Sequence, residues 1–156
     1  MIEKTTLKKA FGETLHDADF VSKSGSWYRS GSDAVVVLNL QKSDFGNYFY
    51  LNVGINLKAL SDEPFPKSNQ CHIGIRADNL VAEDDVLPLN MGINLDEGDD
   101  QDLKGFIDLM NMKVLPLIGG FLRLDQLREH YKKLTFKKAL LFWQARELLE
   151  MPITSK

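Results

Sequence analysis

The sequence holds one cysteine and no apolar run long enough to cross a membrane. The lone thiol, Cys71, excludes an intramolecular disulfide framework and is typical of a protein kept in a reducing cytoplasm. A membrane-spanning helix needs about 20 consecutive apolar residues. The lysines near the N-terminus are not followed by the apolar segment of a signal peptide. We therefore expect a cytoplasmic protein that does not contact a membrane.

Motifs of the common catalytic and cofactor-binding classes are also missing. The chain has no phosphate-binding glycine loop, dinucleotide fingerprint, zinc-ligand spacing or nucleophile elbow. The acidic residues 94–102 do not form a calcium loop, because Gly98 takes a ligand position and Asp99 takes the position that requires glycine. Cys71 and His72 are adjacent on an expected strand, so they point to opposite faces and form no dyad. We expect no cofactor and no metal, and nothing here supports an enzyme.

Charge is unevenly distributed along the chain. The net charge of −3 argues against a general nucleic-acid-binding protein, so we expect no nucleic-acid partner. Residues 78–108 carry ten acids and one base, whereas residues 113–138 carry seven bases and two acids. These segments are either solvated loop and helix faces, or they include an acidic patch, from Glu83 to Asp102, that is presented to a basic partner.

The hydrophobic pattern is most regular over residues 33–57, where it predicts two antiparallel strands joined by a turn. Apolar residues alternate along both strands, and the turn formers of residues 43–46 separate them. If Lys42 faces Asn47, each apolar residue meets another, and a slip of one residue would break this match. The expected pairs are Ala34 with Ile55, Val36 with Val53, Leu38 with Leu51 and Leu40 with Phe49.

The opposite face of this hairpin is polar. Asparagine is depleted in strands, so the amides on this face are locally unfavourable choices. The face is either a solvated sheet surface, which antiparallel sheets commonly have, or a recognition surface of amides and tyrosines. The candidate binding residues are Asn39, Gln41, Tyr48, Tyr50 and Asn52, joined by His72 and Arg76 if the following strand pairs with the hairpin.

Periodicity predicts further elements on both sides of the hairpin. Apolar residues spaced by four predict an amphipathic helix over residues 4–17, with Thr5 or Thr6 as its N-cap. A loop at residues 22–26 precedes a short strand at residues 27–29. Alternation predicts a strand over residues 71–77, with Cys71, Ile73 and Ile75 toward the core and His72, Gly74 and Arg76 toward the polar face. Leu89 to Leu95 repeats the Leu51 to Leu57 pattern and predicts a short extended segment.

The C-terminal third has a helical period. A helix is expected from Asp99, and Pro116 should end or kink it near residues 112–115. A second helix should place Leu124, Leu127, Tyr131 and Leu134 inward. Thr135 would cap a third helix, whose apolar run at residues 139–143 indicates burial on more than one side. At 156 residues with 44% apolar content, we expect one α+β domain over residues 1–156: an antiparallel sheet of about four strands, with an N-terminal helix and a C-terminal three-helix segment on one face.

Several segments resemble the bacterial family catalogued as domain of unknown function 4304. They are residues 20–29 (FVSKSGSWYR), 37–43 (VLNLQKS), 48–55 (YFYLNVGI), 114–116 (VLP) and 124–127 (LDQL), and the hairpin is the sharpest of them. The resemblance implies an α+β fold with a sheet backed by helices. It implies no established activity, but it associates the chain with toxin and immunity systems.

Three functions remain open at this point, of which the third, RNA binding through the tyrosines and the basic C-terminal helices, is disfavoured by the overall acidity. The first is an interaction protein, immunity-like in one form, that contacts another protein through the polar sheet face or the acidic segment. The second is a small-ligand-binding protein or enzyme with a cleft near His72 and Arg76. A pocket lined by both side chains would favour the second. The oligomeric state is left open.

Overall fold

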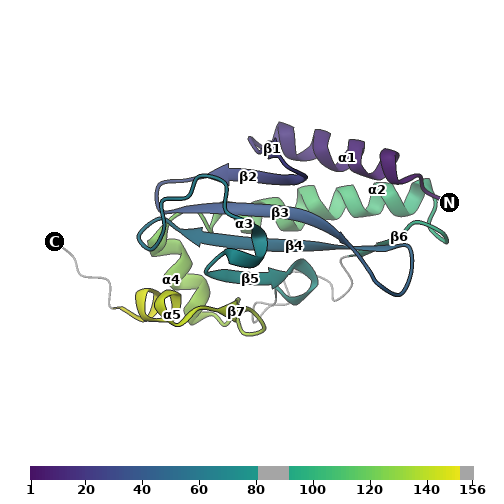
Figure 1. Cartoon of the computed structure of the whole chain (residues 1–156). Coiled ribbons are helices and arrows are strands. Elements are labelled where there is room, and N and C mark those ends of the chain that lie inside the picture. Colours follow the sequence, from purple (N-terminus) through teal and green to yellow (C-terminus); the bar gives the residue numbers. More distant parts are fainter. Residues whose placement is uncertain (81–91, 152–156) are drawn as a thin grey trace.

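The computed structural model describes residues 1–80 and 92–151, in which an antiparallel sheet is covered by helices on one face (Figure 1). Neighbouring strands follow the order β1-β2-β3-β4-β5-β7, and β6 pairs with β4 away from this path. The seven strands exceed the four expected, because the short β1, β6 and β7 add to the sheet. The strands are β1 (Val21–Lys23), β2 (Ser26–Ser30), β3 (Ala34–Lys42), β4 (Tyr48–Leu57), β5 (Ile73–Arg76), β6 (Gly92–Asn94) and β7 (Leu140–Leu141).

Helices α1 and α2 lie side by side over the apolar face of the sheet, where Phe11 and Phe106 meet with ring centroids 6.5 Å apart (Figure 1). The core beneath them holds the apolar faces of β3 and β4, as the alternation predicted. The α-helices are α1 (Lys4–Asp17), α2 (Asp100–Leu109), α3 (Leu115–Gly119), α4 (Leu124–Lys132) and α5 (Trp143–Glu150), and the 3-10 turns are η1 (Ser68–Gln70) and η2 (Ala77–Asn79). The α+β architecture predicted from the sequence is confirmed.

The hairpin β3–β4 has the predicted faces but not the predicted partners. Leu38 pairs with Val53 and Leu40 with Leu51, so the register is displaced by two residues. Ser43 N–H donates to the Tyr48 carbonyl at 2.7 Å, which moves the four-residue loop to residues 44–47. A displacement of two keeps every side chain on its own face, and the core is therefore unchanged.

The first turn of α1 and the strand preceding β2 differ from expectation. Glu3, rather than Thr5 or Thr6, is the N-cap of α1, and its side chain makes no capping bond. The segment expected to be a loop, residues 22–26, instead includes the end of strand β1. This strand pairs with β2 through a turn at Ser24 and Gly25. Both Ser24 and Gly25 have positive φ angles, which the short β1–β2 connection requires.

Pro116 does not end its helix. A π-helical segment, Met110–Val114, joins α2 to α3 without a break, and Pro116 lies in the first turn of α3, where its missing N–H is not needed. Asp99 caps α2, because its carboxylate accepts from Asp102 N–H at 3.0 Å and Asp102 accepts from Asp99 N–H at 2.9 Å. Gly120 is the C-cap residue of α3.

The expected third C-terminal helix is wrong over residues 139–142 and begins only at Trp143. This run forms β7 and the approach to α5, with Phe142 N–H donating to the His72 carbonyl at 2.9 Å. Thr135 is buried but caps no helix. Burial on several sides is also wrong, since Leu140, Phe142 and Trp143 are 80%, 44% and 67% exposed. Leu134, expected inward, is exposed as well.

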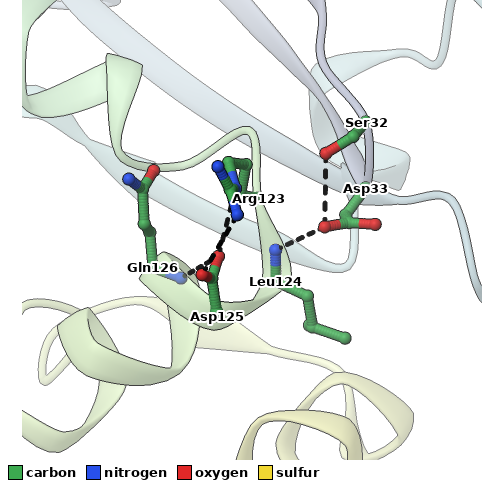
Figure 2. A network of polar contacts seen from close by, with 6 residues as sticks. All are labelled: Ser32, Asp33, Arg123, Leu124, Asp125 and Gln126. Atoms are coloured by element: carbon green, nitrogen blue, oxygen red, sulfur yellow. Dashed lines mark hydrogen bonds and ion pairs between the residues drawn. The ribbon is translucent and has the colours of Figure 1, made fainter.

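Asp33 joins the β2–β3 turn to the N-terminus of α4 (Figure 2). Its Oδ2 accepts from Leu124 N–H at 2.8 Å, and its own N–H donates to the Leu122 carbonyl at 3.0 Å. Arg123, the N-cap residue of α4, provides no side-chain cap, so a residue far back in the sequence takes that role. Arg123 and Asp125 pair separately at 3.3 Å on the exposed surface.

Replacing Asp33 by alanine is expected to lower the free energy of unfolding by about 1 kcal/mol, the usual effect of losing a helix N-cap. Urea denaturation measures this change. Asp33→Asn is the matched control, because its side-chain oxygen can still accept from Leu124 N–H, and it should recover most of the loss. Equal losses in the two variants would contradict the capping role.

Within the described residues no single helix is long and apolar enough to span a membrane. One bent pair, Asp100–Gly119 with Leu124–Lys132, meets the length and composition required, with 110° between its halves.

Candidate functional site

The face of the sheet opposite the helices is divided into a covered half and an open half. The segment that follows β4 covers one half, where Phe65 packs edge-on against Tyr28 with centroids 5.2 Å apart. A small apolar cluster of Tyr28, Val35, Val37 and Cys71 lies beneath Phe65. Cys71 was expected in the main core, but its Sγ lies over Gly54 on this face instead. The sheet face that carries the predicted amide side chains is therefore open to solvent only beyond this cluster.

The open half is hollowed into a pocket of about 1060 Å³. Its floor is formed by β3, β4 and β5, and its walls come from the β1–β2 turn, the segment 65–69, η2 and residues 138–140. Four of the seven predicted binding residues line it: Asn39, Gln41, Asn52 and Arg76.

Amide side chains are linked to one another across the pocket floor. Asn52 Nδ2 donates to Gln41 Oε1 at 2.7 Å, and Asn39 Nδ2 donates to Ser68 Oγ at 3.0 Å. Asn39 and Asn52 are direct cross-strand partners. Asn39 Oδ1 is buried and accepts no hydrogen bond from the described residues. A buried acceptor without a donor is destabilising, and such departures from good packing are concentrated at functional sites.

Cationic side chains border this floor and lie against aromatic rings. The Arg76 guanidinium stacks over Tyr50 at 3.9 Å from the ring centroid, and Lys23 Nζ lies 4.2 Å from the centroid of Phe65. Lys67 and Lys138 also line the pocket. These contacts hold Arg76 and Lys23 in place while leaving their charges unpaired by any acid among residues 1–80 and 92–151.

The remaining predicted residues lie outside the pocket. Tyr50 contacts it through Arg76, and Tyr48 packs against Tyr50 with centroids 4.9 Å apart and against β6 at Gly92. Burial, followed by the neighbouring Tyr50, raises the pKa of Tyr48.

His72 was expected on the polar face but is buried at the end of β4. Its Nδ1 accepts from Leu57 N–H at 2.9 Å, and its ring meets Phe142 edge-on. Arg76 lines the pocket and His72 does not, so the two side chains do not share the cleft expected near them.

Sequence reasoning missed the three lysines and the apolar wall. Lys23 lies in a segment expected to be a loop, and no pattern indicated that this segment or the one that holds Lys67 folds back over the sheet. Lys138 and Leu140 belong to the region mistaken for a helix. The pocket residue Tyr28 could have been identified from the sequence, because it lies on a strand that was predicted correctly. Of the acidic segment Glu83 to Asp102, only residues 92–102 lie within the described part of the chain.

Burial affects three titratable side chains away from the pocket floor: Cys71 and His72 are buried, and His130 is half-buried. Burial raises the pKa of the Cys71 thiol to about 12, so it is not a reactive thiolate at neutral pH. Burial lowers the pKa of His72, and burial followed by the charge of Lys133 lowers the pKa of His130. His130 lies beside Phe121 and shares a 3.1 Å hydrogen bond with Thr135.

These two histidines predict a loss of stability in mild acid. Both pKa values lie below the value of about 6.5 in the unfolded chain. As the pH falls below about 6.5, the unfolded state binds protons that the folded state does not, so the free energy of unfolding falls. Protonation of His72 at Nδ1 would also break its bond with Leu57 N–H. Denaturation between pH 7 and pH 5 measures the effect.

The double variant His72→Gln/His130→Gln should flatten this pH dependence. The control is His16→Gln, which changes an exposed residue of α1 and should keep the dependence of the parent protein. A parent protein equally stable at pH 5 and pH 7 would contradict the assignment to His72 and His130.

The fold and the pocket define a class: α+β proteins in which helices cover one face of an antiparallel sheet and the other face holds a polar pocket. The family model described as Domain of unknown function (DUF4304) matches residues 11–111, so the chain belongs to this family. The match includes the hairpin, as the resemblance predicted, but ends before the segments at 114–116 and 124–127. No curated protein and no solved structure matches the chain. Among the described residues, no group of three or more His, Cys, Asp or Glu could hold a metal ion.

Proposed function

We propose that the protein is a cytoplasmic binding protein that recognises another protein through the pocket on its sheet. The observation that carries this proposal is the convergence of Asn39, Gln41, Asn52 and Arg76 in one hollow of about 1060 Å³. Amides both donate and accept hydrogen bonds, and a rigid strand scaffold holds them with little loss of entropy on binding. Among the described residues that line the pocket, no pair of groups has the arrangement of a nucleophile and its base, which favours binding over catalysis.

An immunity-like role is the form of this proposal that the family association favours. In that role the partner would be a toxin, and its contact with the pocket would block the toxin's activity. Co-expression tests this form, because the protein should restore growth to cells that express the partner.

Site-specific photo-crosslinking tests the binding surface. A photoreactive residue placed at Gln41, which is exposed in the pocket, should form an adduct with one defined protein in the source cell. The matched control is the same residue at Met112, which is 71% exposed on the helical side. Tyr50→Ala removes the ring under Arg76 and should weaken the Gln41 adduct. Identical adducts at both positions, or none at Gln41, would refute the proposal.

A small-ligand-binding protein is the second candidate, because pockets for drug-sized ligands commonly have volumes of about 300–1,000 Å³. Arg76 would then orient the ligand, without His72. Native mass spectrometry of protein purified from the source cell distinguishes the two candidates, since a retained small molecule supports this one.

A further inference from the structure

We infer that the pocket accepts an acidic, extended segment of its protein partner, an inference that rests on the proposed function. Of the residues that the structure describes, four cationic side chains and no aspartate or glutamate line the pocket. The whole chain carries 22 acids and 19 lysines and arginines, so this local excess opposes the overall charge. Complementary charge steers partners to a surface and excludes partners of the wrong sign.

The four cations come from four separate parts of the fold. Lys23 ends β1, Lys67 precedes η1, Arg76 ends β5 and Lys138 precedes β7. None of them forms a salt bridge with another described residue. Their charges are therefore available to a ligand rather than neutralised within residues 1–80 and 92–151.

The aromatic rings at this site favour a peptide over a nucleic acid. Single-stranded nucleic acids are bound by stacking bases on open ring faces. Here Arg76 covers one face of Tyr50, Lys23 covers one face of Phe65, and Tyr28 is buried. The rings thus position cations, and the cations are presented to the ligand.

The amides of the floor suit an extended peptide backbone. Such a backbone offers N–H donors and C=O acceptors in alternation, and asparagine and glutamine side chains can pair with both. A bare anion offers no donors, so it would use the cations but not the amide oxygens. The combination of amides with cations therefore matches acidic side chains on a peptide.

An apolar residue is expected beside the acids of the partner. Leu140 lines the pocket and is 80% exposed on the edge strand β7. It lies opposite Gly74, whose missing side chain leaves the adjacent floor open. A large apolar side chain of the partner would cover Leu140 while neighbouring carboxylates reach Lys138 and Arg76.

Selection of random 12-residue peptides displayed on phage, with the full chain immobilised, tests this inference. Selected peptides should be enriched in Asp and Glu around one large apolar residue. Lys67→Glu/Lys138→Glu should weaken a selected synthetic peptide about tenfold or more, and Leu140→Ser should weaken it less. The matched control, Lys104→Glu/Lys113→Glu, makes the same charge change on exposed residues of the helical layer and should leave affinity nearly unchanged. Affinity should also fall with added salt.

The outcomes separate the two proposals. Pocket-dependent peptides without acidic enrichment would overturn the acidic inference while supporting protein binding. Tighter pocket-dependent binding of a single-stranded oligouridine probe would overturn it in favour of nucleic acid. Acidic peptides equally weakened by the helical-layer control would show attraction by general charge and would overturn the assignment to this pocket. The Gln41 crosslink, which needs no selected peptide, judges the proposed function independently.

Discussion

Replacing Leu38 by alanine is expected to lower the free energy of unfolding by about 2–5 kcal/mol, the range for removing a buried leucine from a packed core. Leu38 is 0% exposed in the centre of β3, between Trp27 of β2 and Val53 of β4. The neighbouring strands are tied by backbone hydrogen bonds, so they cannot close the cavity that the variant leaves. Urea denaturation, with the slope compared to that of the parent protein, measures the loss.

The matched control is Leu140→Ala, which removes the same atoms from a side chain that is 80% exposed. It should change stability by less than about 0.5 kcal/mol. A small loss for Leu38→Ala would contradict the assignment of this side chain to the core, and with it the division of the hairpin into two faces. A large loss for Leu140→Ala would place that residue in the core instead of the pocket wall.

Gly31→Ala is expected to cause the second large loss. A Cβ atom at Gly31 would lie 2.3 Å from Leu122 Cβ and 2.8 Å from the Leu122 carbonyl oxygen. That carbonyl accepts from Asp33 N–H, so the two segments cannot separate without also releasing the cap of α4. We expect a loss of about 1–3 kcal/mol, the usual effect of overpacking, and a Tm lower by roughly 2–4 °C for each kcal/mol.

Gly46→Ala is the control for Gly31→Ala. Gly46 lies in the β3–β4 loop, with no atom within 4 Å of the position of an added Cβ. Its effect should stay within about 0.5 kcal/mol. If both glycines tolerate alanine equally, the close approach of the β2–β3 turn to Leu122 is wrong. Thermal unfolding of the two variants in parallel measures the difference.

In the β3–β4 hairpin, the hydrophobic pattern predicted the face of each side chain correctly but not its cross-strand partner. Alternation has a period of two, so it assigns faces but cannot distinguish registers that differ by two residues. The observed register depends on contacts with a distant segment. Asn47 accepts from Leu95 N–H at 2.9 Å and donates to Asp96 at 3.1 Å, which holds it in the loop rather than in the strand.

Residues 139–143 show a second limit. A short apolar run has no period that distinguishes helix from strand, and its neighbours were helical. The edge of β5 decided the outcome, because Gly74 and Ile73 had free backbone groups that Leu140 and Leu141 could pair with. The π-helical segment before Pro116 is similar, since the pattern predicted a disturbance but packing of Met110 and Val114 in the core kept the helix continuous.

The amino-acid pattern alone determined the α+β class, the central hairpin, the side of each of its residues and the family, because alternation and local propensity act between near neighbours. Tertiary structure alone decided the register, the capping of α4 by Asp33 and the composition of the pocket. Three lysines reach the amide floor only because loops and an edge strand, distant in sequence, fold over it. No local rule relates side chains whose separation along the chain is set by how the whole sheet closes.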